Sequence, residues 1–405
     1  MSSISASAGP LHLPKGFSFS AVTAGIKASG RLDLALAEAA PGTTAAAVFT
    51  RNRVVAAPLQ IGRRSLARAK GQVRAVIVNS GNANCATGRD GLQACQRVCS
   101  ETADLLNASP FEIFPSSTGI IGVPLPVEKI VVSLPALMAV RTATEQGVRR
   151  FAEAIMTTDT RPKIGSTRIR LGKADVSLLG VAKGAGMIHP QLATMLVYLF
   201  TDVAASPGEL KRLLKRTCDQ TFNCISIDGD TSTNDTVLLL ASGHSGAKLG
   251  SSASRSKFER ALLAVCQSLA EQIVCDGVGV KHVVRLRIAQ ARHQSEALRV
   301  ARAIAHSLLV KTAWAGADPN WGRILAAVGA CGVPVQPEKV EIAVGSQVVF
   351  AKGAGRPFDE AKAHQELAQP QCDVQVKLGR GSSDLLFLTT DLTAEYVRIN
   401  ADYST

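Results

Sequence analysis

Aromatic residues and long runs of one charge are scarce in this 405-residue chain. Phe, Trp and Tyr make up 4% of it and apolar residues 46%, so the core must rely on Val, Leu, Ile and Ala. The formal charge is +13, but Lys and Arg occur in short, scattered clusters such as residues 63–70 and 211–216. Nucleic-acid binding favours basic patches interleaved with aromatic side chains, so we expect small anionic substrates and no nucleic acid.

The chain also lacks a disulfide pattern, a zinc pattern, a secretory leader and a membrane span. Its nine cysteines are irregularly spaced, and no Cys-x-x-Cys pair or nearby histidine completes a zinc site around Cys95 and Cys99. The N-terminus has no basic segment followed by an apolar one, and no uncharged stretch approaches transmembrane length. These absences predict a soluble, cytoplasmic protein with reduced cysteines, no metal and no membrane partner.

The remaining sequence has the pattern of an α/β protein. Its length predicts about two domains, or one elaborated double domain. Apolar residues at helical spacing predict helices at 90–106, 145–156, 207–216, 257–273 and 294–310. Apolar, β-branched runs predict strands at 73–80, 195–201, 236–241, 282–288, 340–350, 373–378 and 384–390. We therefore expect mixed sheets with packed helices, without a fixed strand order.

The segment 183–196, KGAGMIHPQLATML, joins a glycine-rich turn to a threonine that opens an apolar run. If the peptide bond between Ala193 and Thr194 were cut, the new α-amine of Thr194 could take the proton of its own hydroxyl. Such an amine has a pKa of about 7.7 to 8.0 in model peptides, so it can act as a base near neutral pH. By position alone, an ordinary strand residue is the favoured interpretation of Thr194, and an ordinary loop histidine that of His189.

The segment 114–124, FPSSTGIIGVP, contains hydroxyl groups directly before a glycine. In a turn, the hydroxyl of Thr118 and unpaired backbone N–H groups could form an oxyanion hole. A plain Pro/Gly/Ser connection is the favoured alternative for this segment alone.

Two further segments are ambiguous. Residues 228–235, DGDTSTND, begin like a calcium loop, but Thr233 and Leu239 stand where such a loop needs glycine and glutamate. Residues 317–323, ADPNWGR, are compatible with a buried corner or with a carboxylate clamp.

Together and in this order, these segments resemble the ornithine acetyltransferase family, the bifunctional glutamate N-acetyltransferases and amino-acid acetyltransferases of the cyclic arginine pathway. The resemblance runs from about Gly16 to Thr405, through GIKASGRLDLALA, VNSGNAN, SSTGIIG, MTTDTRPK, KGAGMIHPQLATML, DGDTSTNDT, DPNWGRI and INADYST. It implies the self-cleaving acetyltransferase fold of that family. Cleavage between Ala193 and Thr194 would give an N-terminal chain of residues 1–193 and a C-terminal chain of residues 194–405, whose folding domains can interleave across the cut.

The resemblance also implies a mechanism. Thr194 would attack the acetyl group of N-acetylornithine, release ornithine and pass the acetyl group to glutamate in a ping-pong cycle. The Thr118 hydroxyl and the Gly119 N–H match the oxyanion hole of the family. Its substrate contacts match Thr157, Lys183, Thr194, Asn400 and Thr405. No cofactor is implied, although some members use acetyl-CoA as a co-substrate, and the cleaved chains would form a heterotetramer of two N-terminal and two C-terminal chains.

One position departs from the family pattern. The family has a glutamate of the substrate site after the segment VCDG, where this chain has Val278. Valine can neither pair with the ammonium group of ornithine nor accept a proton. The enzyme is therefore impaired, its substrate preference has changed, or a neighbouring carboxylate takes over. A self-processing N-terminal-threonine amidase or aminopeptidase and a non-catalytic homologue remain as alternatives.

Overall fold

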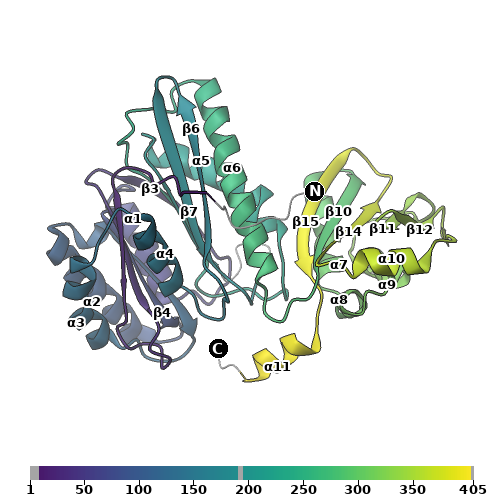
Figure 1. The fold of residues 1–405 in the computed structure, drawn as a ribbon, viewed down its shortest axis with the longest axis horizontal. Coiled ribbons are helices and arrows are strands. Elements are labelled where there is room, and N and C mark those ends of the chain that lie inside the picture. The colour runs from purple at the N-terminus through teal and green to yellow at the C-terminus, as the bar shows by residue number, and fades with distance from the viewer. Residues whose placement is uncertain (1–8, 190–194, 403–405) are drawn as a thin grey trace.

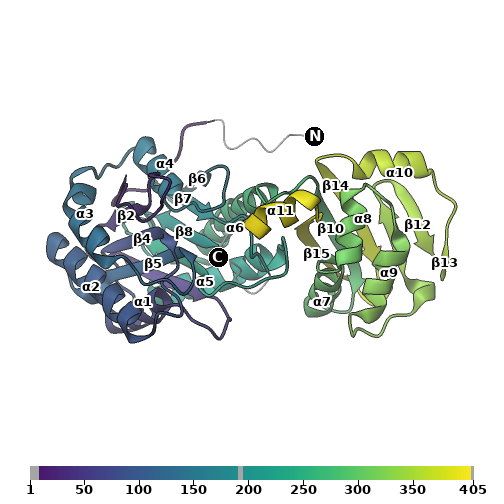
Figure 2. The ribbon, with the colours of Figure 1, turned by 90° about the horizontal axis from the view of Figure 1, so that it is seen from below.

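The computed structural model describes residues 9–189 and 195–402 of the chain. Within these residues, the chain forms three β-sheets with helices packed against them (Figure 1). Two of the sheets and their helices make up one half of the molecule, and the third sheet makes up the other half with its own helices (Figure 2). The last helix, α11 (Ala394–Asp402), leaves the third sheet and returns toward the first half.

The first sheet has four strands in the order β1-β2-β4-β5. They are β1 (Phe17–Val22), β2 (Leu34–Ala39), β4 (Ala75–Asn82) and β5 (Ile113–Ile120). β4 and β5 run parallel, whereas the other neighbours are antiparallel. One face packs against α1 (Ala57–Arg68), α2 (Gly88–Leu106) and α3 (Val127–Ala139).

The second sheet combines strands from both sides of position 194, in the order β3-β9-β8-β7-β6. The strands that precede this position are β3 (Thr44–Phe49), β6 (Lys163–Leu171) and β7 (Ala174–Lys183). The strands that follow it are β8 (Leu196–Thr201) and β9 (Thr236–Ala241). Nearby helices are α4 (Glu145–Ala154), α5 (Pro207–Gln220) and α6 (Ser252–Cys275).

The strands β8 and β9 are buried on both faces because they lie in the middle of four layers. Val197 and Leu199 share a core with α5 and α6. Tyr198 and Phe200 point the opposite way, into a core shared with the first sheet and with Phe151 of α4. A strand that is covered on both faces carries a continuous apolar run, and residues 196–201 accordingly contain no charge.

The third sheet has its own core and lies wholly after position 194. Its order is β13-β12-β11-β14-β10-β15. The strands are β10 (Val283–Ala291), β11 (Glu341–Val344), β12 (Gln347–Ala351), β13 (Ala354–Gly355), β14 (Gln371–Lys377) and β15 (Ser383–Thr390). Its helices are α7 (Gln294–Ala305), α8 (Leu308–Ala315), α9 (Trp321–Ala330) and α10 (Glu360–Leu367). Short 3-10 turns occur at Pro110–Glu112, Phe222–Cys224 and Pro337–Lys339.

The predicted α/β class with mixed sheets is confirmed, but three local predictions were wrong. The helix expected at 294–310 is two helices, because the Ser307 hydroxyl accepts a hydrogen bond from the Val310 N–H and starts α8. The strand expected at 340–350 is a hairpin that turns at Gly345, where φ is +54°. The turn expected at Ser116–Thr118 is part of β5, whose position at the edge of its sheet tolerates Pro115.

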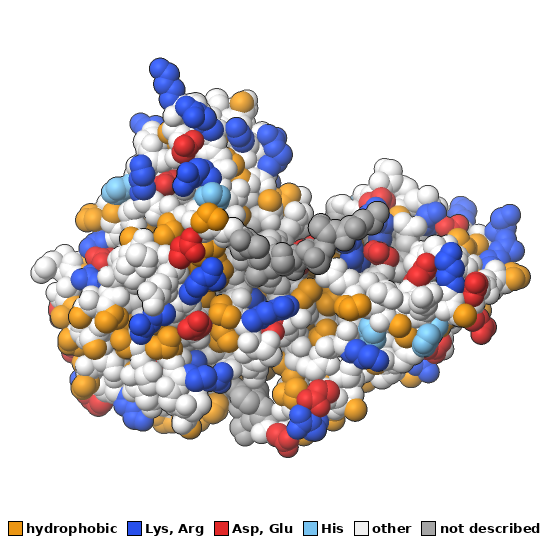
Figure 3. Space-filling model, in the orientation of Figure 1, with side chains coloured by type: hydrophobic (Ala, Val, Ile, Leu, Met, Phe, Trp, Pro, Cys, Tyr) orange, Lys and Arg blue, Asp and Glu red, His pale blue; other side chains and the backbone are white. Residues whose placement is uncertain are grey.

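Basic side chains on the face shown in Figure 3 are spread over both halves of the molecule, among acidic and apolar ones. In the described part of the chain, no helix is both long and apolar enough to cross a membrane. All nine cysteines are free, and seven of them are buried.

Candidate active site

A pocket of about 290 Å³ lies where the first two sheets, the end of α6 and helix α11 meet. It brings together residues that the sequence analysis singled out in four separate segments. These lining residues are Thr118, Gly119, Thr157, Lys183 and Asn400. Val278, the position that departs from the family pattern, lines the same pocket and is 7% exposed. Ala193, Thr194 and Thr405 lie outside the described residues.

Thr118 and Gly119 lie near the end of β5, and pairing with the parallel neighbour β4 fixes their position. Gly119 is opposite Gly81 in this pairing. Its φ is +135°, and a Cβ atom at this position would lie 2.3 Å from the carbonyl carbon of Gly81. Only glycine therefore allows β5 to approach β4 so closely at the pocket.

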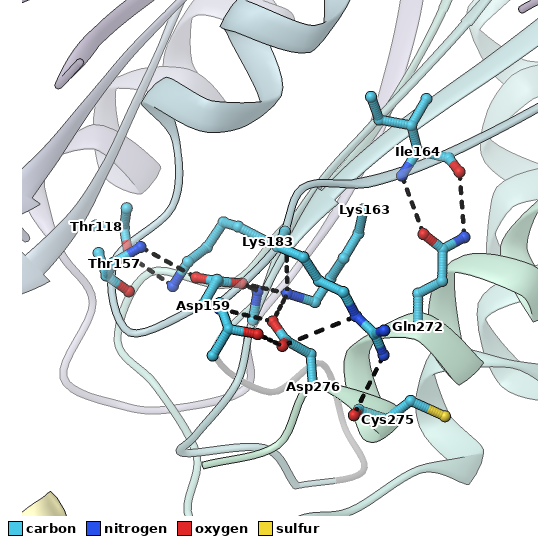
Figure 4. Close-up of polar contacts among 12 residues, drawn as sticks. Thr118, Thr157, Asp159, Lys163, Ile164, Lys183, Gln272, Cys275 and Asp276 are labelled. Carbon is cyan, nitrogen blue, oxygen red and sulfur yellow. Dashed lines mark hydrogen bonds and ion pairs between the residues drawn. The ribbon is translucent and has the colours of Figure 1, made fainter. Parts of the chain in front are cut away.

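A buried lysine reaches this strand end from β7. The Nζ of Lys183 donates a hydrogen bond to Thr118 Oγ1 at 3.2 Å, and the lysine is 3% exposed. Burial lowers the pKa of Lys183, and the carboxylate of Asp159 opposes this effect. The pocket thus holds one cationic group beside the hydroxyl of Thr118, as Figure 4 shows.

Asp159 organises the polar network behind the pocket (Figure 4). Its Oδ1 accepts hydrogen bonds from Lys163 Nζ and from the Gly184 N–H, each at 2.6 Å. Its Oδ2 accepts one from the Thr157 N–H at 3.0 Å. Burial opposes the ionisation of Asp159, but the ammonium groups of Lys183 and Lys163 outweigh it and hold its pKa well below the ordinary value.

A second carboxylate extends this network to the end of α6. Lys163 is fully buried, and its Nζ lies 2.6 Å from Asp276 Oδ2 as well as from Asp159 Oδ1. Asp276 also accepts hydrogen bonds from the backbone N–H and the hydroxyl of Thr160. Since Asp276 lies two residues before Val278, this triad ties the Thr157 segment and the Val278 segment into one wall of the pocket.

The segment that was rejected as a calcium loop forms another wall. Asp228 accepts hydrogen bonds from the Met187 N–H at 2.6 Å, from the Ile188 N–H at 2.8 Å and from the Tyr396 hydroxyl at 3.2 Å. Burial raises the pKa of the Asp228 carboxyl above its ordinary value. Asn234 donates to the backbone carbonyl of Ser117 at 2.9 Å and so joins this wall to β5. Within residues 9–189 and 195–402, no cluster of His, Cys, Asp or Glu could hold a metal ion.

The two other predicted candidates, His189 and the segment 317–323, do not line the pocket. His189 stacks beside His306, with His189 Nδ1 and His306 Nε2 at 3.3 Å, and burial lowers the pKa of each imidazole to about 4. Trp321 stacks on Phe350 with ring centroids 5.3 Å apart, and Arg323 donates to a backbone carbonyl. Trp321 is thus packed against the third sheet, and Arg323 makes no ion pair with a carboxylate in the described part of the chain.

Sequence reasoning missed the triad of Asp159, Lys163 and Asp276. The first two are visible in MTTDTRPK at a four-residue spacing, but this segment is not a helix, so the spacing did not indicate a contact. Asp276 lies 113 residues from Lys163, and no local pattern could have joined them.

The mixed sheets with packed helices make this an α/β protein, and its pocket with a buried lysine suits a small polar molecule. Residues 18–405 match the ArgJ family. The arginine biosynthesis bifunctional protein ArgJ of Methylococcus capsulatus is 44% identical over 96% of this chain and 95% of its own length. The glutamate N-acetyltransferase of Methanopyrus kandleri is 44% identical over 98% of this chain and 100% of its own length. The protein belongs to the ArgJ family.

Among solved structures, the ornithine acetyltransferase of Mycobacterium tuberculosis in complex with ornithine is 35% identical to this chain. The match covers 47% of this chain and 97% of that chain, with a TM-score of 0.40.

Proposed function

We propose that this protein transfers the acetyl group of N2-acetyl-L-ornithine to L-glutamate through an acetyl-threonine at Thr194. Its membership of the ArgJ family supports this activity. The observation that carries the assignment of the site is the pocket itself. It joins Thr118, Gly119, Thr157, Lys183 and Asn400, although these residues are spread over most of the chain. Acetyl-CoA is proposed as an alternative acetyl donor for glutamate, and no cofactor takes part.

The contacts within the pocket suggest how an oxyanion would be stabilised. Because Thr118 Oγ1 accepts a hydrogen bond from Lys183, the hydroxyl hydrogen of Thr118 remains available to an oxygen in the pocket. A developing negative charge on the acetyl oxygen would thus meet the Thr118 hydroxyl and the Gly119 N–H. The ammonium group of Lys183 lies behind them and also suits a substrate carboxylate.

The proposed cycle begins after self-cleavage between Ala193 and Thr194. The α-amine of Thr194 takes the proton of its hydroxyl, and the oxygen bonds to the acetyl carbon. The bond from that carbon to the α-nitrogen of ornithine then breaks, and the proton passes to the departing nitrogen. The α-amine of glutamate next attacks the acetyl ester and regenerates the threonine hydroxyl. An amide is exchanged for an amide, so no external energy source is needed.

We also propose that the cleaved chains, residues 1–193 and 194–405, stay associated and pair into a heterotetramer. The second sheet supports their association, because β8 and β9 pair with β7 and β3 across the cleavage position. We assign the enzyme to the cytoplasm, because seven buried free cysteines suit a reducing compartment.

Two other functions compete with acetyl transfer. An amidase or aminopeptidase with the same nucleophile would pass the acyl group to water instead of glutamate, so it would release free acetate. An impaired homologue is suggested by Val278, whose side chain offers the pocket neither charge nor hydrogen bond. Asp228 and Asp230 line the same pocket and are the carboxylates that could replace the missing glutamate.

The decisive experiment is intact-mass analysis of the purified protein and of Thr194→Ala, coupled to an assay with N-acetylornithine and glutamate. We expect the wild type to consist of two fragments and to form ornithine and N-acetylglutamate in equal amounts. Thr194→Ala should remain one inactive chain, whereas Thr312→Ala, an exposed threonine on α8, should behave as the wild type. An uncut and inactive wild type would refute the proposal, and acetate release without N-acetylglutamate would favour the amidase.

A further inference from the structure

Asp235 is a buried carboxyl group that the proposed acetyl transfer does not use. It lies directly before β9, is 1% exposed and does not line the pocket. Its Oδ1 accepts a hydrogen bond from the Met195 N–H at 3.0 Å. Its Oδ2 is also buried and has no hydrogen-bond partner within residues 9–189 and 195–402. A carboxyl group that is buried and incompletely hydrogen-bonded is costly, so its position calls for an explanation.

The contact with Met195 gives Asp235 a special position, because Met195 directly follows Thr194 in the chain. Both backbone hydrogen-bonding groups of Met195 are bonded to the segment at the start of β9. Asp235 binds its N–H, and the backbone N–H of Thr236 donates to its carbonyl at 3.2 Å. The next residue, Leu196, is then paired with Thr236 in the parallel ladder of β8 and β9. Asp235 and Thr236 thus fix the backbone of Met195, the residue that directly follows the proposed nucleophile.

Further hydrogen bonds fix the backbone around Asp235. Its backbone carbonyl accepts a hydrogen bond from the Thr50 N–H at 3.0 Å, just beyond β3. Its neighbour Asn234 donates hydrogen bonds to the carbonyls of Ala83 and of Ser117, which directly precedes Thr118 in β5. Burial raises the pKa of the Asp235 carboxyl well above its usual range, against smaller opposing effects of the Met195 N–H, of Lys183 and of two neighbouring hydroxyls.

We propose that Asp235 is a positioning residue for self-cleavage, acting through the amide of Met195. This inference rests on the proposed function, because it presupposes that the chain is cut before Thr194. In the cleavage step, the Thr194 hydroxyl oxygen bonds to the carbonyl carbon of Ala193, the carbon–nitrogen bond breaks, and the hydroxyl proton goes to the nitrogen of Thr194. Water then hydrolyses the ester to the Ala193 carboxylate and the free threonine hydroxyl. The first step requires the Thr194 hydroxyl oxygen to be held close to the carbonyl carbon of Ala193. Asp235 favours this placement because its carboxylate fixes the N–H of Met195, the next residue.

Asp202 offers a matched control at the opposite end of β8. It is 2% exposed, and its carboxylate also accepts backbone hydrogen bonds, from Ser177 N–H at 2.9 Å and from Lys15 N–H at 3.2 Å. It therefore has the same chemistry, burial and sheet as Asp235, but it holds the end of β8 that is remote from Thr194. A merely structural role for Asp235 predicts that both residues respond alike.

The test follows the cleavage of freshly synthesised full-length chain by intact mass, together with the melting temperature of each product. We expect Asp235→Ala to slow cleavage by about ten-fold or more, since small displacements of reacting groups have such effects. Asp235→Asn keeps an oxygen for the Met195 N–H and should cleave within about three-fold of the wild type. Asp202→Ala should lower the melting temperature without slowing cleavage.

Each result decides the inference. Folded Asp235→Ala that cleaves at the wild-type rate would overturn it, and so would an Asn variant as slow as Ala. If Asp235→Ala does not fold, Asp235→Glu takes its place, because its longer side chain displaces the oxygen and should also slow cleavage relative to Asn. A wild type that never cleaves would instead refute the proposed function, so the two failures are distinguishable.

Discussion

Replacing Lys163 by methionine should destabilise the protein strongly although the substitution keeps most of the aliphatic side chain. Lys163 is fully buried, and its Nζ lies 2.6 Å from a carboxylate oxygen of both Asp159 and Asp276. Removing one partner of a buried ion pair costs about 3–5 kcal/mol, because the remaining charge stays buried without compensation. Asp159 keeps two backbone N–H donors and Asp276 keeps Thr160, so we expect the lower end, about 3 kcal/mol.

The same change should alter how stability depends on pH. In the wild type, the pKa of folded Asp159 lies below its unfolded value of about 3.9, so its ionised form stabilises the fold above that pH. This contribution is lost as the pH falls toward the folded pKa. In Lys163→Met, one of the two ammonium groups that depress the pKa is gone, so the acid limb of the stability curve should move to higher pH.

Melting temperatures of Lys163→Met and wild type between about pH 3 and pH 7 test both statements. Lys215→Met is the matched control, because Lys215 also pairs with an aspartate four residues away, at 2.7 Å, but on the surface. Exposed pairs contribute about 0–1 kcal/mol, so this variant should be nearly neutral. A Lys163→Met protein as stable as the Lys215→Met protein, with an unchanged acid limb, would contradict the reasoning.

Two further predictions concern the pocket. Gly119→Ala should reduce kcat for acetyl transfer by about 100-fold, because the added Cβ would overlap Gly81 and displace the end of β5. Gly122→Ala is the control, because Gly122 also has a positive φ but a Cβ there would meet no atom within 4 Å. Equal losses of kcat in the two variants would show that the overlap with Gly81 is not the cause. Val278→Glu should lower the KM for N-acetylornithine by about ten-fold, the effect of about 1.4 kcal/mol. An equal fall for N-acetylnorvaline, which lacks the side-chain ammonium group, would show that charge is not the reason.

The buried strands of the second sheet could be predicted because their apolar pattern is visible within a few consecutive residues. The runs at 195–201 and 236–241 carry no charge and are almost wholly apolar because both faces of β8 and β9 are covered, and the two strands were predicted to within one residue of their bounds. The breaks were harder to predict. Ser307 divides a helix and Gly345 turns a hairpin inside otherwise periodic segments, because one capping bond or one positive φ overrides the apolar period.

Only those residues of the candidate site that lie in recognisable sequence motifs were predicted. Thr118, Lys183 and Asn400 were named separately, and the structure brings them to one pocket. The partners that hold them were not predicted, because the contact of Lys163 with Asp276 and that of Asp235 with Met195 join residues 113 and 40 positions apart. Such contacts depend on the packing of α6 against the second sheet and on the pairing of β9 with β8 within it, which no single segment encodes.

The composition of the second sheet also bears on whether folding or the proposed cleavage comes first. Three of its strands come from residues before position 194 and two from residues after it, and β8 pairs with β7 from the earlier part. In a separately made C-terminal fragment, β8 and β9 could pair with each other, but their outer edges would lack β7 and β3 and would be a template for aggregation. If the chain is cut before Thr194, as proposed, the uncut chain has to assemble this sheet first. The proposed cleavage would then follow folding, and the two pieces could not be exchanged between molecules without unfolding.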